Sequence, residues 1–122
     1  MIEGRQNEPI KVVVLVSALS EWTAVKTHFQ EPAVKRSPFG GYFFTSIAGV
    51  SCVLCHGGWG KVSAAASTQY VIDRWHPQLL LNIGTCGGFE GHINVGEVVL
   101  ADETLIYDIQ ERMGDPDEAL GF

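Results

Sequence analysis

A glutamate near the N-terminus and a threonine set among glycines are the residues of this sequence best suited to chemistry. Glu21 lies a few positions after a short apolar run, and Thr85 lies within the segment Gly84–Gly88 that follows a second apolar run. A carboxylate can orient water or hydroxyl groups. Backbone N–H groups of a glycine loop, with a threonine hydroxyl, can hold a sugar or an anion. The simpler alternatives are a helix-dipole charge at Glu21 and an ordinary turn at Gly84–Gly88.

The two apolar runs predict the strands that position these residues. Residues 12–16 read Val-Val-Val-Leu-Val, and residues 79–83 read Leu-Leu-Leu-Asn-Ile. Runs without alternation are typical of strands that are buried on both faces of a sheet covered by helices. Ligands of open α/β sheets bind beyond the carboxyl ends of such strands. We therefore expect Glu21 and Thr85 at the same edge of the sheet.

Helices and a hairpin are expected around these strands. Trp22, Val25 and Phe29 recur at helical spacing, and Ser17 and Ser20 are candidate N-caps for that helix. The other expected elements are a hairpin of residues 42–48 and 50–56 that turns at Gly49, a helix over residues 61–75 and a strand over residues 97–101.

This order of elements predicts an α/β fold with a mixed, twisted sheet flanked by helices. No internal repeat divides the chain, so a single domain over residues 1–122 is expected. Residues 1–9 are polar and are set aside as a leader or a cloning remnant, because residues 2–5 read Ile-Glu-Gly-Arg, a protease site used in expression vectors. No secretory signal is evident and no apolar run could span a bilayer, so a cytoplasmic protein is expected.

Charge and cysteine content argue against several classes of partner. The formal net charge is −6 and the chain has only eight Lys and Arg residues, whereas nucleic-acid binders need a basic face. We therefore expect neither a nucleic-acid nor a membrane partner. Three cysteines are an odd number and do not suggest a disulfide framework.

Two short motifs that could bind a cofactor are rejected. Cys52-Val-Leu-Cys55-His56 matches the pattern for covalent haem attachment, but it lies inside a strand-like apolar run, and zinc would need a second ligand pair. Gly57–Val62 lacks the first glycine and the final Ser or Thr of a phosphate-binding P-loop. We therefore expect no cofactor and no metal.

Four segments, in this order and spacing, resemble the purine nucleoside phosphorylase and nucleosidase superfamily. The resemblance runs from about Lys11 to Asp108 and implies a nucleoside phosphorylase-like fold of which this chain is the N-terminal half. The segments are VVVLVSALSEW at residues 12–22, GWGKVSAA at 58–65, NIGTCGGF at 82–89 and VGEVVLAD at 95–102.

The resemblance also implies roles for individual residues. Thr85 matches the hydroxyl residue beside the ribose or phosphate site, and Glu21 is nearest to the carboxylate that positions water or the 5′ side of the ribose. The spacing at Glu21 differs by about one residue from that of methylthioadenosine nucleosidases. The resemblance thus implies a catalytic role for Glu21 and a substrate-binding role for Ala18, Leu19, Asn82, Thr85, Cys86 and Gly87.

Asn82 favours hydrolysis over phosphorolysis. Phosphorylases of this superfamily carry an arginine near this position to bind phosphate, and Asn82 has no charge to offer. The resemblance therefore implies hydrolysis of a purine N-glycosidic bond in a substrate like methylthioadenosine or S-adenosylhomocysteine. The alternatives are a phosphate-dependent nucleoside phosphorylase and a non-catalytic module that binds nucleosides or serves assembly.

Two segments of the superfamily are absent from these 122 residues. One contains Met-Glu, whose glutamate holds the ribose hydroxyls, and the other contains Ser-Asp or Asn-Asp, whose aspartate is the general acid. The resemblance therefore implies that this chain lacks part of the catalytic machinery, and also that the protein forms a homo-oligomer. The base, the 5′ substituent and the oligomeric state are left open by the sequence.

Overall fold

The computed structural model describes residues 9–107 of the chain. Contacts divide the chain into two compact units, with the boundary after Cys86. The first unit holds all the helices and strands of the described residues, and residues 87–107 of the second unit form turns and irregular structure. Within residues 9–107, no helix combines the length and the apolar character needed to cross a membrane.

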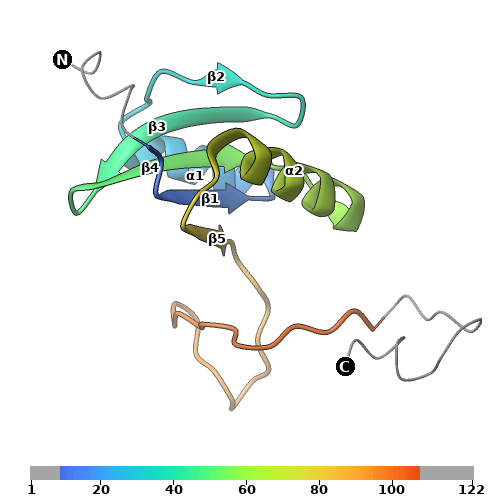
Figure 1. Ribbon diagram of the computed structural model, residues 1–122. Helices are drawn as coiled ribbons and strands as arrows, with labels where there is room; N and C mark the ends of the chain where they lie inside the picture. Colours follow the sequence, from blue (N-terminus) through green and yellow to red (C-terminus); the bar gives the residue numbers. More distant parts are fainter. Residues whose placement is uncertain (1–8, 108–122) are drawn as a thin grey trace, which may run out of the picture. The chain divides into compact units, whose positions relative to one another are not determined.

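The first unit is a mixed five-stranded sheet with two helices (Figure 1). The strand order is β2-β3-β4-β1-β5, with β1 parallel to β4 and to β5, while β3 runs antiparallel to β2 and β4. The predicted mixed sheet is therefore confirmed. The elements are β1 (Val12–Val16), α1 (Leu19–His28), β2 (Lys35–Arg36), β3 (Gly41–Ile47), β4 (Val50–His56), α2 (Gly60–Trp75) and β5 (Leu79–Ile83).

The predicted hairpin is the β3–β4 pair. The strands turn at Ala48 and Gly49, which have φ angles of 51° and 79°. Two consecutive positive φ angles are the geometry of a type I′ turn, whose twist matches that of the paired strands. The turn sets the register in which Ile47 lies opposite Val50.

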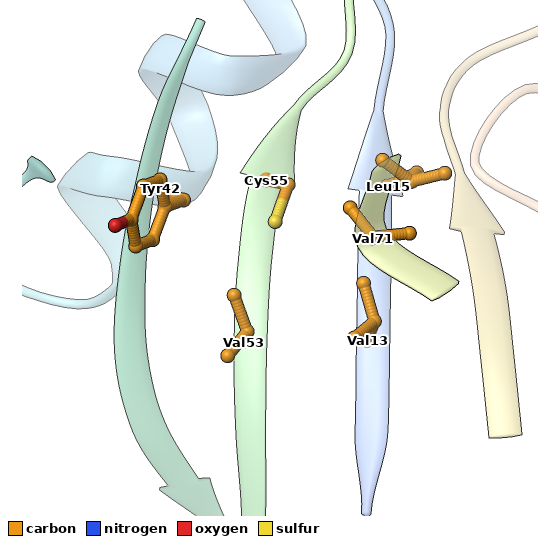
Figure 2. Packing of buried hydrophobic residues seen from close by; sticks show 6 residues of the cluster. All are labelled: Val13, Leu15, Tyr42, Val53, Cys55 and Val71. Carbon is orange, nitrogen blue, oxygen red and sulfur yellow. The ribbon is translucent and has the colours of Figure 1, made fainter. Parts of the chain in front are cut away.

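Side chains of β1 and β4 alternate between two hydrophobic clusters on opposite faces of the sheet. Val13 and Leu15 pack with Val71 of α2, whereas Val14 and Val16 lie in the cluster that contains Trp22 of α1. Figure 1 accordingly shows the two helices on opposite faces of the sheet. The predicted burial of β1 on both faces is confirmed. Figure 2 shows the α2-side cluster, formed by Val13, Leu15, Tyr42, Val53, Cys55 and Val71.

The expectation that residues 79–83 are buried on both faces is wrong. Leu79, Leu81 and Ile83 of β5 are 50%, 40% and 43% exposed. Among the described residues β5 pairs only with β1, so it is an edge strand. Only Leu80 of this strand packs against a core cluster.

The strand expected at residues 97–101 is also absent. This segment is irregular, and Val98 and Leu100 are 97% and 92% exposed. A strand is stable only when its backbone groups pair with a neighbour. No described segment pairs with residues 97–101.

Candidate functional site

The carboxyl ends of three parallel strands meet at one edge of the sheet. Val16 at the end of β1 pairs with His56 of β4 on one side and with Ile83 of β5 on the other. The segment that leads from β1 into α1 therefore starts beside Gly84, which follows β5. This adjacency brings Glu21, in the first turn of α1, to Thr85.

Glu21 accepts three hydrogen bonds, and two of them join these two segments. Its Oε2 accepts the backbone N–H of Thr85 at 2.5 Å and the Thr85 hydroxyl at 2.8 Å. Its Oε1 accepts the backbone N–H of Ala18 at 3.1 Å. We call this arrangement the Glu21–Thr85 clamp. It connects residues that are 64 positions apart in the chain and brings together three of the predicted site residues.

The clamp keeps the Glu21 carboxyl ionised. The hydrogen bond from the Thr85 hydroxyl lowers the pKa of Glu21 below its ordinary value of 4.5, and the N–H groups of Thr85 and Ala18 lower it further. Partial burial acts in the opposite direction, but its effect is smaller. Hydrogen bonds to the charged form always favour that form. Glu21 is therefore a carboxylate at neutral pH.

Glu21 also explains why the predicted N-caps are wrong. The N-cap of α1 is Ala18, not Ser17 or Ser20, and the Ala18 side chain makes no cap hydrogen bond. Glu21 instead reaches back from the third helical position to the Ala18 N–H, which is one half of a capping box. Its charge also lies favourably near the N-terminus of the helix.

Gly84 allows the carboxylate to approach the backbone after β5. A Cβ at this position would lie 3.0 Å from Glu21 Oε2 and 3.2 Å from Oε1. Both distances are shorter than ordinary van der Waals contact. The need for glycine here thus comes from the close carboxylate.

Gly84→Ala is expected to weaken the clamp, because the carboxylate must retreat from the new methyl group and its hydrogen bonds to Thr85 lengthen. We expect the pKa of Glu21 to rise towards its ordinary value and the free energy of unfolding to fall by about 1 kcal/mol. Carboxyl-carbon NMR titration and urea unfolding measure the two effects.

Gly87→Ala is the matched control. A Cβ at Gly87 would meet nothing within 4 Å, so the pKa of Glu21 should not change in this variant. An unchanged pKa in Gly84→Ala as well would contradict the close approach of Glu21 to Gly84.

A hollow of about 340 Å³ lies beside the clamp. Two of the predicted substrate-binding residues, Ala18 and Leu19, line it. His56 lines it too; its ring stacks on Trp22 at 5.8 Å, and its Nε2 lies 3.1 Å from the Ser17 carbonyl oxygen. The full lining is Ser17, Ala18, Leu19, Ser20, His56, Gly58 and Trp59.

Neither His56 nor Trp59 is among the site residues predicted from the sequence. Trp59 is 77% exposed and precedes α2, so its ring is available to a ligand in the hollow. The adjacency of β4 and β1 places both residues here. The sequence signal for this placement was the strand-like run that ends at His56. That run indicates a place at the site only once β4 is known to be parallel to β1.

The remaining predicted site residues do not join the clamp. The side-chain amide of Asn82 donates to the Leu15 carbonyl oxygen at 3.4 Å, which ties β5 to β1. Asn82 is exposed, so it is not a buried core amide. Cys86 is an exposed free thiol, and Gly87 belongs to the second unit.

The cysteines of the haem-like pattern lie on opposite faces of β4. Cys52 is in the α1-side cluster and Cys55 in the α2-side cluster, so the two thiols cannot reach one haem from the same face. Burial raises the pKa of the Cys55 thiol to about 12, which keeps it protonated and unreactive. Among residues 9–107 there is no group of three or more His, Cys, Asp or Glu side chains that could hold a metal ion.

Two curated relatives are similar in sequence to most of this chain. A 5′-methylthioadenosine/S-adenosylhomocysteine nucleosidase from a Marinomonas species is 33% identical over 101 residues, which cover 82% of this chain and 44% of the relative. The nucleosidase of the same description from Bacillus licheniformis is 32% identical, covering 82% of this chain and 43% of the relative. The chain thus spans less than half the length of these relatives.

Solved structures show the same fold. The nucleosidase from Colwellia psychrerythraea, solved in complex with adenine, superposes with a TM-score of 0.60 at 24% identity, covering 74% of this chain and 37% of that one. The S. pneumoniae enzyme, solved with the transition-state inhibitor MT-ImmA, also gives a TM-score of 0.60, at 25% identity, covering 71% of this chain and 38% of that one.

The resemblance noted in the sequence is thereby confirmed by relatives and by fold. A family model matches residues 11–120, which include Glu21, Thr85 and the residues that line the hollow. The chain belongs to the phosphorylase superfamily.

Proposed function

We propose that the Glu21–Thr85 clamp and the hollow beside it belong to a nucleosidase. This nucleosidase hydrolyses the N-glycosidic bond of a purine nucleoside, with methylthioadenosine or S-adenosylhomocysteine as the substrate type. The observation that carries the proposal is an ionised carboxylate clamped to Thr85 beside a hollow at the carboxyl ends of β1, β4 and β5. The similarity to nucleosidases of this description supports the substrate type.

The proposed reaction replaces the bond from C1′ to the purine nitrogen by a bond from C1′ to the oxygen of water. The purine leaves with the bonding electron pair and takes up a proton, most simply at N7, while the sugar gains oxocarbenium character. Water loses a proton as it attacks. A carboxylate at this place lowers the barrier, because it orients the water and faces the positive charge as it develops.

Glu21 is the residue we assign to this catalytic role. Its Oε2 already accepts two hydrogen bonds, whereas its Oε1 accepts only that of Ala18. A carboxylate oxygen has two lone pairs, so Oε1 can accept a further hydrogen bond from water or a ribose hydroxyl. We assign substrate binding to Ala18, Leu19, Asn82, Thr85, Cys86 and Gly87.

The proton donor for the purine is not assigned within these residues. We infer from the resemblance that the superfamily segments that supply the general acid and the glutamate for the ribose hydroxyls lie outside these 122 residues. We propose that residues 1–122 form one part of a single nucleosidase domain that needs those segments, in a cytoplasmic homo-oligomer.

Adenine release from methylthioadenosine tests this proposal. We expect the full-length product of the native gene to release adenine without phosphate, and the 122-residue chain by itself to release little. Rapid release by the 122-residue chain would show that its catalytic machinery is complete. Nucleoside binding in calorimetry without turnover at any length would favour a binding module instead.

A further inference from the structure

We propose that His56 is a positioning residue for the proposed reaction, because its ring holds the turn between β1 and α1 that forms one wall of the hollow. This turn, residues 17–20, supplies four of the seven residues that line the hollow. The inference rests on the proposed function and deepens it. It assigns the shape of this wall to a side chain at the end of β4, outside the predicted set of site residues.

The Ser17 carbonyl decides which nitrogen of the His56 ring carries the proton. Nε2 of His56 lies 3.1 Å from the Ser17 carbonyl oxygen, and the two residues are 39 positions apart in the chain. A carbonyl oxygen only accepts hydrogen bonds, so Nε2 must be the donor. A neutral imidazole carries one proton on its two nitrogens. The neutral ring of His56 is therefore the Nε2–H tautomer.

Contacts from three directions hold the His56 ring in this orientation. His56 is the register partner of Val16, the residue that precedes Ser17. Its ring lies parallel to that of Trp22, with the centroids 5.8 Å and the planes 10° apart. A Cβ on Gly40 would lie 2.7 Å from the His56 carbonyl oxygen and 3.0 Å from its Nδ1. Nδ1 thus faces Gly40, and Nε2 faces the turn.

The Ser17 carbonyl lies at the junction between the sheet and the helix. The Val16 carbonyl before it accepts the N–H of Gly57 at 2.9 Å, which continues the pairing of β1 with β4. The Ala18 carbonyl after it accepts the N–H of Trp22 at 2.9 Å, which is the first bond of α1. Between these two bonds, His56 Nε2 is the partner of the Ser17 carbonyl. A backbone carbonyl needs such a partner where the chain changes direction.

The orientation of this carbonyl affects the residues that face the ligand. Ala18 and Leu19 follow Ser17 directly, and both line the hollow. Rotation of the Ser17 peptide group would move both of them relative to the ring of His56. Such a loss of order weakens the bound substrate and the transition state alike, so it raises KM and leaves kcat nearly unchanged. His56 therefore acts through the turn and takes no part in the bond changes.

Two substitutions of His56 in the full-length product separate the hydrogen bond from the ring contact. His56→Phe keeps a flat ring against Trp22 but removes the donor to Ser17. His56→Gln removes the ring but retains a side-chain N–H that can take the place of Nε2–H. We expect His56→Phe to raise the KM for methylthioadenosine about tenfold with kcat within about twofold of the wild type, and His56→Gln to restore KM to within about threefold. Steady-state adenine release gives both constants, and urea unfolding checks that each variant is folded.

A control variant and a measurement on the wild type complete the test. His28→Phe is the matched control, because His28 is an exposed histidine at the other end of α1 whose ring meets that of Phe29 edge-on at 5.0 Å. Its KM should equal that of the wild type. Nitrogen NMR of the neutral His56 ring in the wild type should show a proton on Nε2 and none on Nδ1. This spectrum needs no substitution, so it tests the inference even if a variant fails to fold.

The outcomes separate this inference from the proposed function. A proton on Nδ1 and none on Nε2 would overturn the inference, and so would a folded His56→Phe protein with the KM of the wild type. An equal rise of KM in His56→Phe and His56→Gln would show that the hydrogen bond to Ser17 is not what matters, which also overturns it. Absence of adenine release by the wild type would instead refute the proposed function, and the tautomer would still decide whether His56 holds Ser17.

Discussion

Phe43→Ala is expected to lower the free energy of unfolding by about 3–5 kcal/mol, a large part of the stability of a small domain. The Phe43 side chain is 1% exposed, and its ring centroid lies 5.5 Å from that of Trp22 and 5.5 Å from that of Phe29. Its removal leaves a cavity between β3 and α1 that rigid neighbours cannot fill. Urea unfolding followed by circular dichroism measures the loss.

Phe44→Ala is the matched control for this prediction. Phe44 is the next residue of β3, points to the other face of the sheet and is 39% exposed. Its ring makes T-shaped contacts with those of Tyr42 and Trp75, and because the side chain is partly exposed its loss should cost about 1 kcal/mol. A cost for Phe44→Ala equal to that for Phe43→Ala would contradict the burial of Phe43 beneath α1.

This core matters to the site because Trp22 directly follows Glu21. Trp22 is 4% exposed and is held between Phe43 and the ring of His56. The buried tryptophan therefore fixes the first turn of α1, and this in turn aims the carboxylate at Thr85. A cavity under Trp22 is expected to loosen the clamp as well as the fold.

The parts of the fold that the sequence predicted are those that depend on local patterns. The apolar run of β1 has no alternation because both of its faces are covered, and Gly49 supplies the positive φ of the hairpin turn. The exposure of Leu79 and Leu81 could not be predicted in this way. A run of leucines has the same sequence at the centre of a sheet and at its edge, and only the strand order tells them apart.

The site was predictable by residue but not by geometry. Glu21 and Thr85 each follow a strand, and each was singled out from its own surroundings. Their contact depends on the parallel pairing of β1 with β5, which a single sequence does not reveal. The same limit explains why Ser17 and Ser20 looked like better caps than Ala18, since the decisive group is the Glu21 carboxylate.

Glu21→Ala is expected to weaken purine nucleoside binding by the full-length product by about tenfold to a hundredfold. The variant loses one hydrogen-bond acceptor of the proposed site and releases Thr85 from its position, and a hydrogen bond to a charged group contributes about 1.5–3 kcal/mol. Thr85→Ala should act in the same direction. Isothermal calorimetry with a non-hydrolysable methylthioadenosine analogue measures both.

The same carboxylate should make stability depend on pH in acid. The pKa of Glu21 is lower in the folded protein than in the unfolded chain, so its stabilising effect is fully present above its ordinary value of 4.5 and is lost as the pH falls through the lowered value. At neutral pH we expect the wild type to exceed Glu21→Gln by about 1 kcal/mol, as for the loss of a helix cap. Urea unfolding at several pH values gives the difference.

The two measurements on Glu21 together decide what the clamp does. Glu31→Ala, which removes an exposed carboxylate from beyond the other end of α1, should leave nucleoside affinity unchanged. Unchanged affinity in both Glu21→Ala and Thr85→Ala would remove these residues from the site. A wild-type advantage over Glu21→Gln that does not shrink at all as the pH falls below the ordinary pKa of 4.5 would mean that the ionised carboxylate does not hold Thr85 in solution. If Glu21→Ala instead loses nucleoside affinity and Glu21→Gln loses the acid-sensitive part of the stability, the same carboxylate both fixes the loop after β5 and binds the ligand.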